Sequence, residues 1–572
     1  MSTTAYVLTI RPSDDHRLVS LCTALRELHL TVEVVEGVPG RDQPAAEYFV
    51  HAMASFARYG RVLTPGEVGC VLGHARAYER LVASGAPFAF VFEDDALLKD
   101  LPKVIQDVQE VLDARSVDYL HLGNGENLPG ADRVIGRRIL PGAPCFEVNT
   151  ASLPVLYGCY AYALSRDAAS ALLASLREVL FHSDDFPAVA AVLPRHRIHC
   201  WPLVAHPADY RDSSIEDERQ LRLVPHLRDG LLMQFRRVAR TVVAARLLAL
   251  RRALTACRPS FTRVFHEERR FDSSVARTNE RGDADKRTAA RSLPAVRSAM
   301  KIYVLTIRAA TDPRLSSLCR TLQASGHEVE VVTGPVGGMF SAADYFTLSM
   351  ACYKRYGYML APGELGCTLG HAQVYERIAG APEPYALVLE DDVLLDQLVA
   401  SLPAVQAVLR AGIVDYLHLG GLDGLTARLQ IIGRPLIAER RCFELSATTL
   451  SFLDRTCGVI LGREAAAALC TEIRTAPFRI DDFREIVQIL PKHRVHCWPL
   501  VSHPVDLQES AIERERHLAL SSQVRRRSHA VMAMALRRSF TARVERLQDV
   551  ISLWRHERER VFRSLAGCSP TE

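Results

Sequence analysis

The chain has 572 residues, of which 48% are hydrophobic and 24% are charged. This length is enough for two or more domains with their own cores, and the composition excludes a disulfide-stabilised miniprotein, a disordered chain and a fibrous one. The formal net charge of +4 is too small to indicate nucleic-acid binding, so we expect no nucleic-acid partner.

The 14 cysteines are scattered without a Cys-x-x-Cys pair. The sequence therefore predicts neither a structural zinc site nor a disulfide framework, and it favours a reducing compartment. The N-terminus enters an expected strand over residues 5–10 without a basic segment followed by an apolar one. No stretch of about 18 apolar residues lacks a charge, so we expect neither a signal peptide nor a membrane span.

This opening strand belongs to a segment that occurs twice. The motif Y-V-L-T-I-R begins at Tyr6 and again at Tyr303, an offset of 297 residues. The motif P-G-E-x-G-C-x-L-G-H begins at Pro65 and again at Pro362, and later motifs follow in the same register. A period this long indicates two tandem domains, here called copy one and copy two, rather than a solenoid.

Within each copy, short apolar runs alternate with longer amphipathic stretches, which predicts an α/β fold with a mostly parallel sheet. Ligands of such sheets bind at the carboxyl ends of the strands. The expected domains are copy one over residues 1–220, a basic amphipathic helical segment and linker over 221–299, copy two over 300–517 and a basic helical tail over 518–572.

Three consecutive acidic residues follow an apolar run in each copy. They are Glu93, Asp94 and Asp95 in copy one and Glu390, Asp391 and Asp392 in copy two. Adjacent anions repel one another, but Mg²⁺ and Mn²⁺ bind carboxylate and phosphate oxygens, so the pattern predicts a divalent metal site. Alternation along a strand would place the first and third acids on the same side. The alternative is an acidic loop that opens the next helix.

A helix is predicted to begin after Thr64, because Thr64 to Glu67 has the pattern of a capping box with proline at the first helical position. In copy two Ala361 replaces the threonine but Glu364 remains, so capping alone does not explain this acid, although a recent duplication would. Two histidines lie further along these helices, and we expect both to be packed core or supporting residues rather than metal ligands. They are His74 and His371.

Together, the P-G-E-x-G-C-x-L-G-H motif, the strand that ends in E-D-D and the opening Y-V-L-T-I-R resemble the glycosyltransferase 25 family. That family includes bacterial lipooligosaccharide galactosyltransferases and collagen galactosyltransferases, and the resemblance covers both copies. It implies a GT-A type, Rossmann-like fold and a nucleotide-sugar donor, commonly UDP-galactose. It also implies a divalent metal, Mn²⁺ or Mg²⁺, held by a DxD-like motif that corresponds here to the two acidic triplets.

Such a metal would stabilise the charge that develops on the departing diphosphate. Arginine forks suit phosphate oxygens, so arginines at or just after the first strand are candidate donor contacts, with solvated surface arginines as the alternative. The retained glutamates of the helix starts are further candidates. The donor-binding candidates are Arg11, Arg17, Glu67, Arg308, Arg314 and Glu364.

An inverting transfer also needs a base for the acceptor hydroxyl, usually a carboxylate. Asp185 and Asp482 are the candidates, each the second member of an Asp-Asp pair, and helix capping is the alternative. Spacing does not decide which member of a pair faces the substrate.

Histidine, cysteine and tryptophan are concentrated over residues 195–202 and 492–499. Their spacing fits no standard zinc pattern, so a buried strand is expected there. His206 and His503 follow, and by analogy with some GT-A enzymes they are candidates to complete the metal site.

The copies differ most in one stretch. Copy one has Y-G-C-Y-A-Y-A-L-S from Tyr157, where copy two has D-R-T-C-G-V-I-L-G from Asp454. The loss of the aromatic residues puts donor or acceptor binding by copy two in doubt. Either the domains add different sugars or one of them has become a scaffold.

The leading hypothesis is a tandem hexosyltransferase that extends a cell-surface glycan, such as lipooligosaccharide, on the cytoplasmic face. Its basic segments would contact an anionic inner membrane peripherally, unless they are helices packed on their own domains. A sugar nucleotidylyltransferase is one alternative, although the Gly-rich loop that it normally needs after the first strand is missing. A catalytically silent nucleotide-sugar-binding or assembly module is the other.

Overall fold

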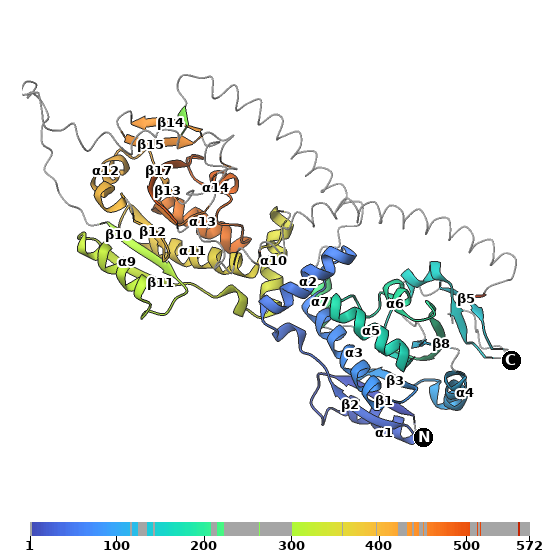
Figure 1. Cartoon of the computed structure of the whole chain (residues 1–572). Helices are drawn as coiled ribbons and strands as arrows, with labels where there is room; N and C mark the ends of the chain where they lie inside the picture. The colour runs from blue at the N-terminus through green and yellow to red at the C-terminus, as the bar shows by residue number, and fades with distance from the viewer. Residues whose placement is uncertain are drawn as a thin grey trace, which may run out of the picture. The chain divides into compact units, whose positions relative to one another are not determined.

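The computed structural model describes residues 3–114, 117–123, 134–140, 143–207, 214–221, 262–263, 300–356, 358–395, 397–420, 432–437, 440–445, 455–503 and 559–560, together with 450, 453, 512 and 515. The chain forms two compact units, one mainly from residues 1–222 and the other mainly from residues 223–340 and 347–516 (Figure 1). The expected basic segments over 221–299 and 518–572 lie outside the described residues, apart from 221, 262–263 and 559–560. None of the described helices is long and apolar enough to cross a membrane.

Copy one alternates strands and helices. Its strands are β1 (Thr4–Thr9), β2 (Thr31–Glu36), β3 (Phe88–Glu93), β4 (Tyr119–Gly123), β5 (Ile135–Arg138), β6 (Phe146–Val148), β7 (Ala161–Ser165) and β8 (His199–Val204). Its α-helices are α1 (His16–Glu27), α2 (Ala45–Tyr59), α3 (Pro65–Ser84), α4 (Leu101–Asp113), α5 (Arg166–Glu178), α6 (Phe186–Val192) and α7 (Ser214–Leu221).

Copy two repeats this order. Its strands are β10 (Lys301–Thr306), β11 (Glu328–Thr333), β12 (Tyr385–Glu390), β13 (Tyr416–Gly420), β14 (Ile432–Ile437), β15 (Arg440–Leu445), β16 (Gly458–Gly462) and β17 (His496–Val501). Its α-helices are α9 (Pro313–Ala324), α10 (Ala342–Tyr356), α11 (Pro362–Gly380), α12 (Leu398–Arg410), α13 (Arg463–Thr475) and α14 (Phe483–Ile489). Two short strands outside the copies are β9 (Thr262–Arg263) and β18 (Glu559–Arg560).

Within the described residues each unit has a nine-stranded sheet, in the order β18-β5-β6-β8-β4-β7-β3-β1-β2 or β11-β10-β12-β16-β13-β17-β15-β14-β9. The predicted α/β fold is confirmed, but the sheets are mixed. Strand β1 pairs in parallel with β2 and β3, whereas β7 lies antiparallel between β3 and β4. The chain has already reversed before it reaches β7: β5 pairs antiparallel with β6, and β6 runs antiparallel to β8, which is parallel to β4. Strand β7 has the same direction as β6, so it enters the sheet antiparallel to β4.

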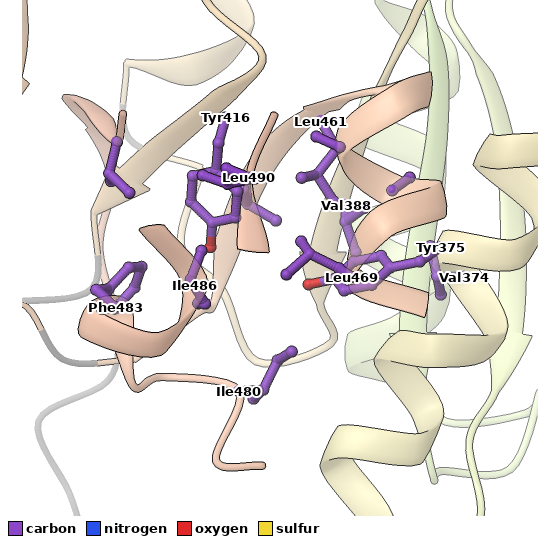
Figure 2. Packing of buried hydrophobic residues seen from close by; sticks show 14 of the residues in the cluster. Val374, Tyr375, Val388, Tyr416, Leu461, Leu469, Ile480, Phe483, Ile486 and Leu490 are labelled. Carbon is purple, nitrogen blue, oxygen red and sulfur yellow. The ribbon is translucent and has the colours of Figure 1, made fainter. Parts of the chain in front are cut away.

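Helices cover both faces of each sheet, because the strands carry apolar side chains on both sides. In copy two, Figure 2 shows one of these layers: Tyr375 of α11 and Leu469 of α13 pack with Val388 of β12 and Leu461 of β16. On the opposite face a second cluster includes residues of α9 and α12. The carboxyl ends of the parallel strands remain at the sheet edge, where the candidate site lies.

Candidate functional site

The second acid of each triplet is bound to the end of the first strand. Leu8 of β1 lies opposite Glu93 of β3 in the parallel register, so the two strand ends are adjacent. Thr9 Oγ1 donates a hydrogen bond to Asp94 Oδ2, and Arg11 Nε lies 3.4 Å from the same oxygen. Copy two has the same arrangement, in which Arg308 Nε lies 3.2 Å from Asp391 Oδ2, beside Thr306.

The third acid faces a histidine from the end of β8. Backbone hydrogen bonds between Leu97 and Ala205, in both directions, tie the loop after β3 to the loop after β8. They place His206 Nε2 3.2 Å from Asp95 Oδ2. Burial acts to raise the pKa of Asp95, but the hydrogen bond and charge of His206 outweigh it, so the pKa is lowered. Burial likewise acts to lower the pKa of His206, but Asp95 outweighs it and the pKa is raised.

The other carboxylate oxygen of Asp95 differs from the one that faces His206. Its Oδ1 is buried and has no hydrogen-bond partner among the residues that the structure describes, and the same holds for Asp392 Oδ1 in copy two. A buried carboxylate oxygen normally has a partner, so its absence fits the binding of a cation there. The residues of copy one thus fit a divalent metal held by Asp95, with Asp94 and His206 beside it. The metal role of both triplets stays a prediction.

Glu93 turns to a different environment from the two aspartates. Strand β3 ends at Glu93 and the next two acids form a turn, so the side-chain alternation of a strand does not extend to Asp95. Glu93 Oε1 lies 3.3 Å from His74 Nε2 and 3.4 Å from Cys159 Sγ. Burial raises the pKa of Glu93. In copy two, Glu390 Oε1 lies 3.2 Å from His371 Nε2.

Only some of the predicted donor-binding arginines reach the acids. Arg11 and Arg308 do so, as described above. Arg17 and Arg314 have exposed side chains in the first turns of α1 and α9, and their backbone N–H groups donate to the N-cap aspartates of these helices. Their donor-binding role stays a prediction.

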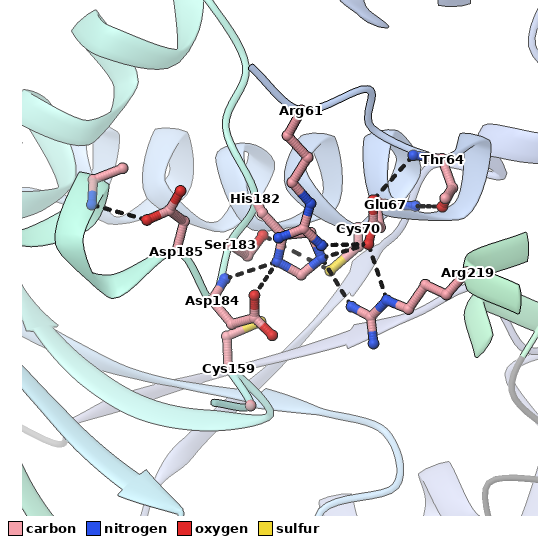
Figure 3. A network of polar contacts seen from close by, with 12 residues as sticks. Arg61, Thr64, Glu67, Cys70, Cys159, His182, Ser183, Asp184, Asp185 and Arg219 are labelled. Atoms are coloured by element: carbon pink, nitrogen blue, oxygen red, sulfur yellow. Dashed lines mark hydrogen bonds and ion pairs between the residues drawn. The ribbon is translucent and has the colours of Figure 1, made fainter. Parts of the chain in front are cut away.

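Glu67 lies within a buried polar network (Figure 3). The predicted capping box is present, since Glu67 Oε2 accepts from the backbone N–H of Thr64, at 3.0 Å. Glu67 Oε1 lies 2.9 Å from both Arg61 Nη2 and Arg219 Nε, and 3.1 Å from His182 Nε2. These contacts give Glu67 a structural role, and its donor-binding role stays a prediction.

The corresponding acid of copy two is held in the same way. Glu364 Oε2 accepts from the backbone N–H of Ala361 and Oε1 pairs with Arg479 Nε, both at 2.9 Å. The carboxylate thus caps α11 and holds an arginine even without a threonine at the cap. These two contacts account for its presence in copy two.

The two members of each Asp-Asp pair have different environments. Asp185 caps α6, because Oδ1 accepts from the backbone N–H of Ala188 at 3.2 Å. Asp482 caps α14, with Oδ1 accepting from the backbone N–H of Arg484 at 3.3 Å. Asp184 instead pairs with His182 Nδ1 in the polar network of Figure 3. Burial acts to raise the pKa of Asp184, but His182 outweighs it and the pKa is lowered. The base role of Asp185 and Asp482 stays a prediction.

The histidine beside the third acid has a different hydrogen-bond partner in each copy. His206 Nδ1 lies 2.8 Å from the carbonyl oxygen of Pro207, which can only accept, so Nδ1 carries a proton. Nε2 is then the nitrogen that contacts Asp95, and in the neutral ring it is the one that can bind a cation. In copy two, Arg455 Nη1 lies 3.2 Å from His503 Nδ1, and arginine can only donate. His503 must therefore carry its proton on Nε2, which lies 3.0 Å from Asp392 Oδ2.

This difference arises from one position. Arg455 corresponds to Gly158, and both have a left-handed backbone, with φ of 63° and 83°. Glycine adopts this conformation without strain, whereas a residue with a Cβ does not. Copy two thus retains the backbone turn of copy one while adding a guanidinium group beside its acidic cluster.

Sequence reasoning missed two kinds of residue. Thr9 and Thr306 belong to the repeated Y-V-L-T-I-R motif, which was a usable signal for a role at the site. Cys159 gave no such signal, because it is distant in sequence from Glu93. The buried strand expected around Trp201 is confirmed as β8, with Trp201 1% exposed.

Comparison with known proteins identifies the family. The family model described as "Glycosyltransferase family 25 (LPS biosynthesis protein)" matches residues 3–187 and 300–410, which is more than half of the chain. The chain belongs to glycosyltransferase family 25. Both matched segments include an acidic triplet, so the family resemblance holds for both copies.

Individual relatives within family 25 match a smaller part of this chain than the family model does. "Probable inactive glycosyltransferase 25 family member 3" of Rattus norvegicus is 30% identical over 209 residues, which cover 34% of this chain and 34% of that protein. "Inactive glycosyltransferase 25 family member 3" of Homo sapiens is 34% identical over 152 residues, 25% of this chain and 24% of that protein. The matched part of this chain thus spans about a third of the length of these relatives, or less.

Proposed function

We propose that copy one is a metal-dependent hexosyltransferase that moves a hexose, with galactose as the first candidate, from a UDP-sugar to a cell-surface glycan such as lipooligosaccharide. One observation carries this proposal: Asp95 Oδ1 is buried and has no hydrogen-bond partner among the described residues, and the imidazole of His206 lies beside the same carboxylate, with Nε2 3.2 Å from Oδ2. Carboxylate and neutral imidazole in this combination can hold Mn²⁺ or Mg²⁺. The bound ion would stabilise negative charge on the departing diphosphate.

The chain's own residues would prepare this site. Thr9 and Arg11 fix the orientation of Asp94. In this proposal the guanidinium of Arg11 would also bind a phosphate of the donor. Asp185 remains the proposed base for the acceptor hydroxyl. Because its Oδ1 caps α6, its Oδ2 is the oxygen left to receive a proton.

Copy two is proposed to be catalytically silent. The proton on His503 Nε2 prevents this nitrogen from binding a metal, and Arg455 adds a positive charge that disfavours a second cation nearby. Copy two would then serve as a binding or scaffold domain.

The acceptor and location are part of the same proposal. A glycolipid acceptor on the cytoplasmic face would bring the protein to an anionic membrane, which the basic segments outside the described residues would contact.

The test is consumption of a panel of UDP-sugars by the full chain with Mn²⁺, with Mg²⁺ and with chelator, alone and with lipooligosaccharide. Metal-dependent release of UDP from one donor supports the proposal, and transfer to the acceptor defines the reaction. If no donor is hydrolysed or transferred with either metal, the transferase proposal fails.

A second candidate, a catalytically silent nucleotide-sugar-binding module, is favoured by the word "inactive" in the names of the relatives. It predicts that UDP binds, as measured by calorimetry, without turnover of any donor.

A further inference from the structure

Four potential metal ligands lie close together in copy one, next to the candidate donor site. Cys70 and His74 lie one turn apart on the same face of α3, and Glu93 ends β3. The backbone N–H of Glu93 donates to the carbonyl of Tyr160 at 2.8 Å, which places Cys159 beside the glutamate. His74 and Cys159 are buried, and Figure 3 shows Cys70 and Cys159 near the polar network.

The distances suit one tetrahedral ion. One Sγ from each cysteine, one ring nitrogen of His74 and one oxygen of Glu93 all lie within 4.8 Å of one another. His74 Nε2 is 3.3 Å from both Glu93 Oε1 and Cys159 Sγ, and the latter two atoms are 3.4 Å apart. Zinc–ligand bonds of about 2.0 to 2.3 Å in a tetrahedron give ligand–ligand distances of about 3.3 to 3.8 Å.

The hydrogen bonds of His74 direct its free lone pair to this point. Tyr162 Oη donates its only proton to Tyr78 Oη at 3.1 Å, so it must accept from His74 Nδ1 at 2.7 Å. In the neutral ring Nε2 then carries a lone pair that faces a carboxylate oxygen and a sulfur. A ligand histidine typically has its second nitrogen fixed by a hydrogen bond in this way.

Cysteine binds metal as the thiolate and histidine as the neutral ring, so an ion bound here would displace the protons that these groups carry without it.

Copy two lacks the complete arrangement. Cys367, His371 and Glu390 remain, but Thr456 replaces Cys159 and Val459 replaces Tyr162. The Nδ1 atom of His371 and the hydroxyl of Tyr375 have no hydrogen-bond partner within the described part of the chain. Both the second sulfur and the hydrogen bond that fixes the histidine are therefore missing.

We propose that copy one binds a structural Zn²⁺ ion through Cys70 Sγ, His74 Nε2, Glu93 Oε1 and Cys159 Sγ. Four protein ligands close the coordination sphere, so the ion would have a structural and not a catalytic role. By joining α3, β3 and the segment that precedes β7, it would fix the strand end from which Asp94 and Asp95 extend. The proposal does not depend on transferase activity.

The test measures metal in the full chain, purified with a reductant and without added chelator. We expect about one zinc per chain by elemental mass spectrometry. Replacement by Co²⁺ should give the visible bands of tetrahedral cobalt and a thiolate charge-transfer band. Cys159→Thr, the residue of copy two, should lower zinc affinity at least tenfold and remove the charge-transfer contribution of one sulfur.

Matched variants keep the test decisive. Cys367→Ser alters the corresponding thiol of copy two and should leave zinc content unchanged, and Asp95→Asn should do so as well, which separates this site from the proposed donor metal. If Cys159→Thr does not fold, the double variant Thr456→Cys, Val459→Tyr should add a second zinc to copy two. The proposal is overturned if the wild-type chain neither retains zinc nor gives the tetrahedral cobalt spectrum, or if Cys70 and Cys159 are joined in a disulfide.

Discussion

The two copies share their strand order but differ in the short segment that leads into the antiparallel strand β7 or β16 and includes its first residues. In copy one this segment supplies Gly158, Cys159 and Tyr162. In copy two the corresponding residues are Arg455, Thr456 and Val459. The acids of the triplet are retained in both copies, so the comparison shows that conserving the anionic residues does not conserve the protonation and charge of their neighbours.

The largest expected effect is the loss of catalysis on changing the third acid of copy one. Asp95→Asn should reduce metal-dependent UDP release about 100-fold or more, because it removes a ligand of the ion that stabilises the leaving group. Asp392→Asn is the matched control and should retain nearly full activity. UDP release at saturating donor measures both. Equal losses in the two variants would contradict the assignment of activity to copy one.

The second-largest expected effect tests the positive charge that Arg455 adds to copy two and that Gly158 does not add to copy one. Gly158→Arg should reproduce the arrangement of copy two, in which a guanidinium contacts the histidine of the loop after β8. We expect at least a tenfold loss of Mn²⁺ affinity in copy one, measured from the Mn²⁺ dependence of UDP release in a background of Asp392→Asn. Gly158→Ala, which adds only the strain of a Cβ, is the control. If both variants lose the same affinity, backbone strain and not charge is responsible.

The pH dependence of metal binding should be confined to copy one. Asp95 raises the pKa of His206 above its usual range, and a metal must displace the proton of the imidazolium form. The affinity for Mn²⁺ should therefore rise by up to about tenfold per pH unit until the pH exceeds this raised pKa. His206→Gln should flatten the profile, and His503→Gln should not alter it. Calorimetric Mn²⁺ titrations across the range provide the measurement.

In the metal-free protein, the two members of this pair change the stability of the fold in opposite directions as the pH rises. The folded pKa of His206 is raised, so its contribution to stability is complete below the unfolded pKa and is lost as the pH rises through the folded value. The pKa of Asp95 is lowered, so its contribution is present above the unfolded value and is lost on acidification.

The smallest effect concerns the backbone of copy two. Arg455 has a φ of 63°, and a left-handed conformation costs a residue with a Cβ about 1 kcal/mol. Arg455→Gly should therefore stabilise copy two by roughly this amount, which would slow hydrogen exchange of the β16 amides about fivefold. Faster exchange would show that the contact with His503 outweighs the strain.

Much of the fold followed from the sequence. The repeat, the α/β class, the helix start at Thr64 and the buried strand around Trp201 were all predicted, because each depends on local pattern or on similarity between the copies. The mixed character of the sheets was not predicted. The position of β7 between β3 and β4 depends on long-range pairing, and its apolar sequence has no feature that specifies strand direction.

The site was predictable only as a region. The acidic triplets and Arg11 were found from sequence and lie together, whereas Arg17 and Asp185 were found by the same reasoning and have helix-terminal contacts. A short motif shows that acids gather at a strand end, but it does not show which partner each oxygen has. The Cys–His–Glu–Cys cluster has no standard zinc spacing, since its ligands come from α3, β3 and the segment that precedes β7.

The sequence by itself determined that the chain is a tandem repeat of one family 25 domain type and that both copies keep their acids. Only the tertiary structure decided which atoms those acids face. Glu93 contacts His74 and Cys159, whereas Asp95 contacts His206. Arg455 donates to Nδ1 of His503, so that this ring carries its proton on Nε2, whereas His206 carries a proton on Nδ1. These outcomes depend on side-chain directions at strand ends and on hydrogen bonds between residues far apart in the chain, which local sequence pattern does not encode.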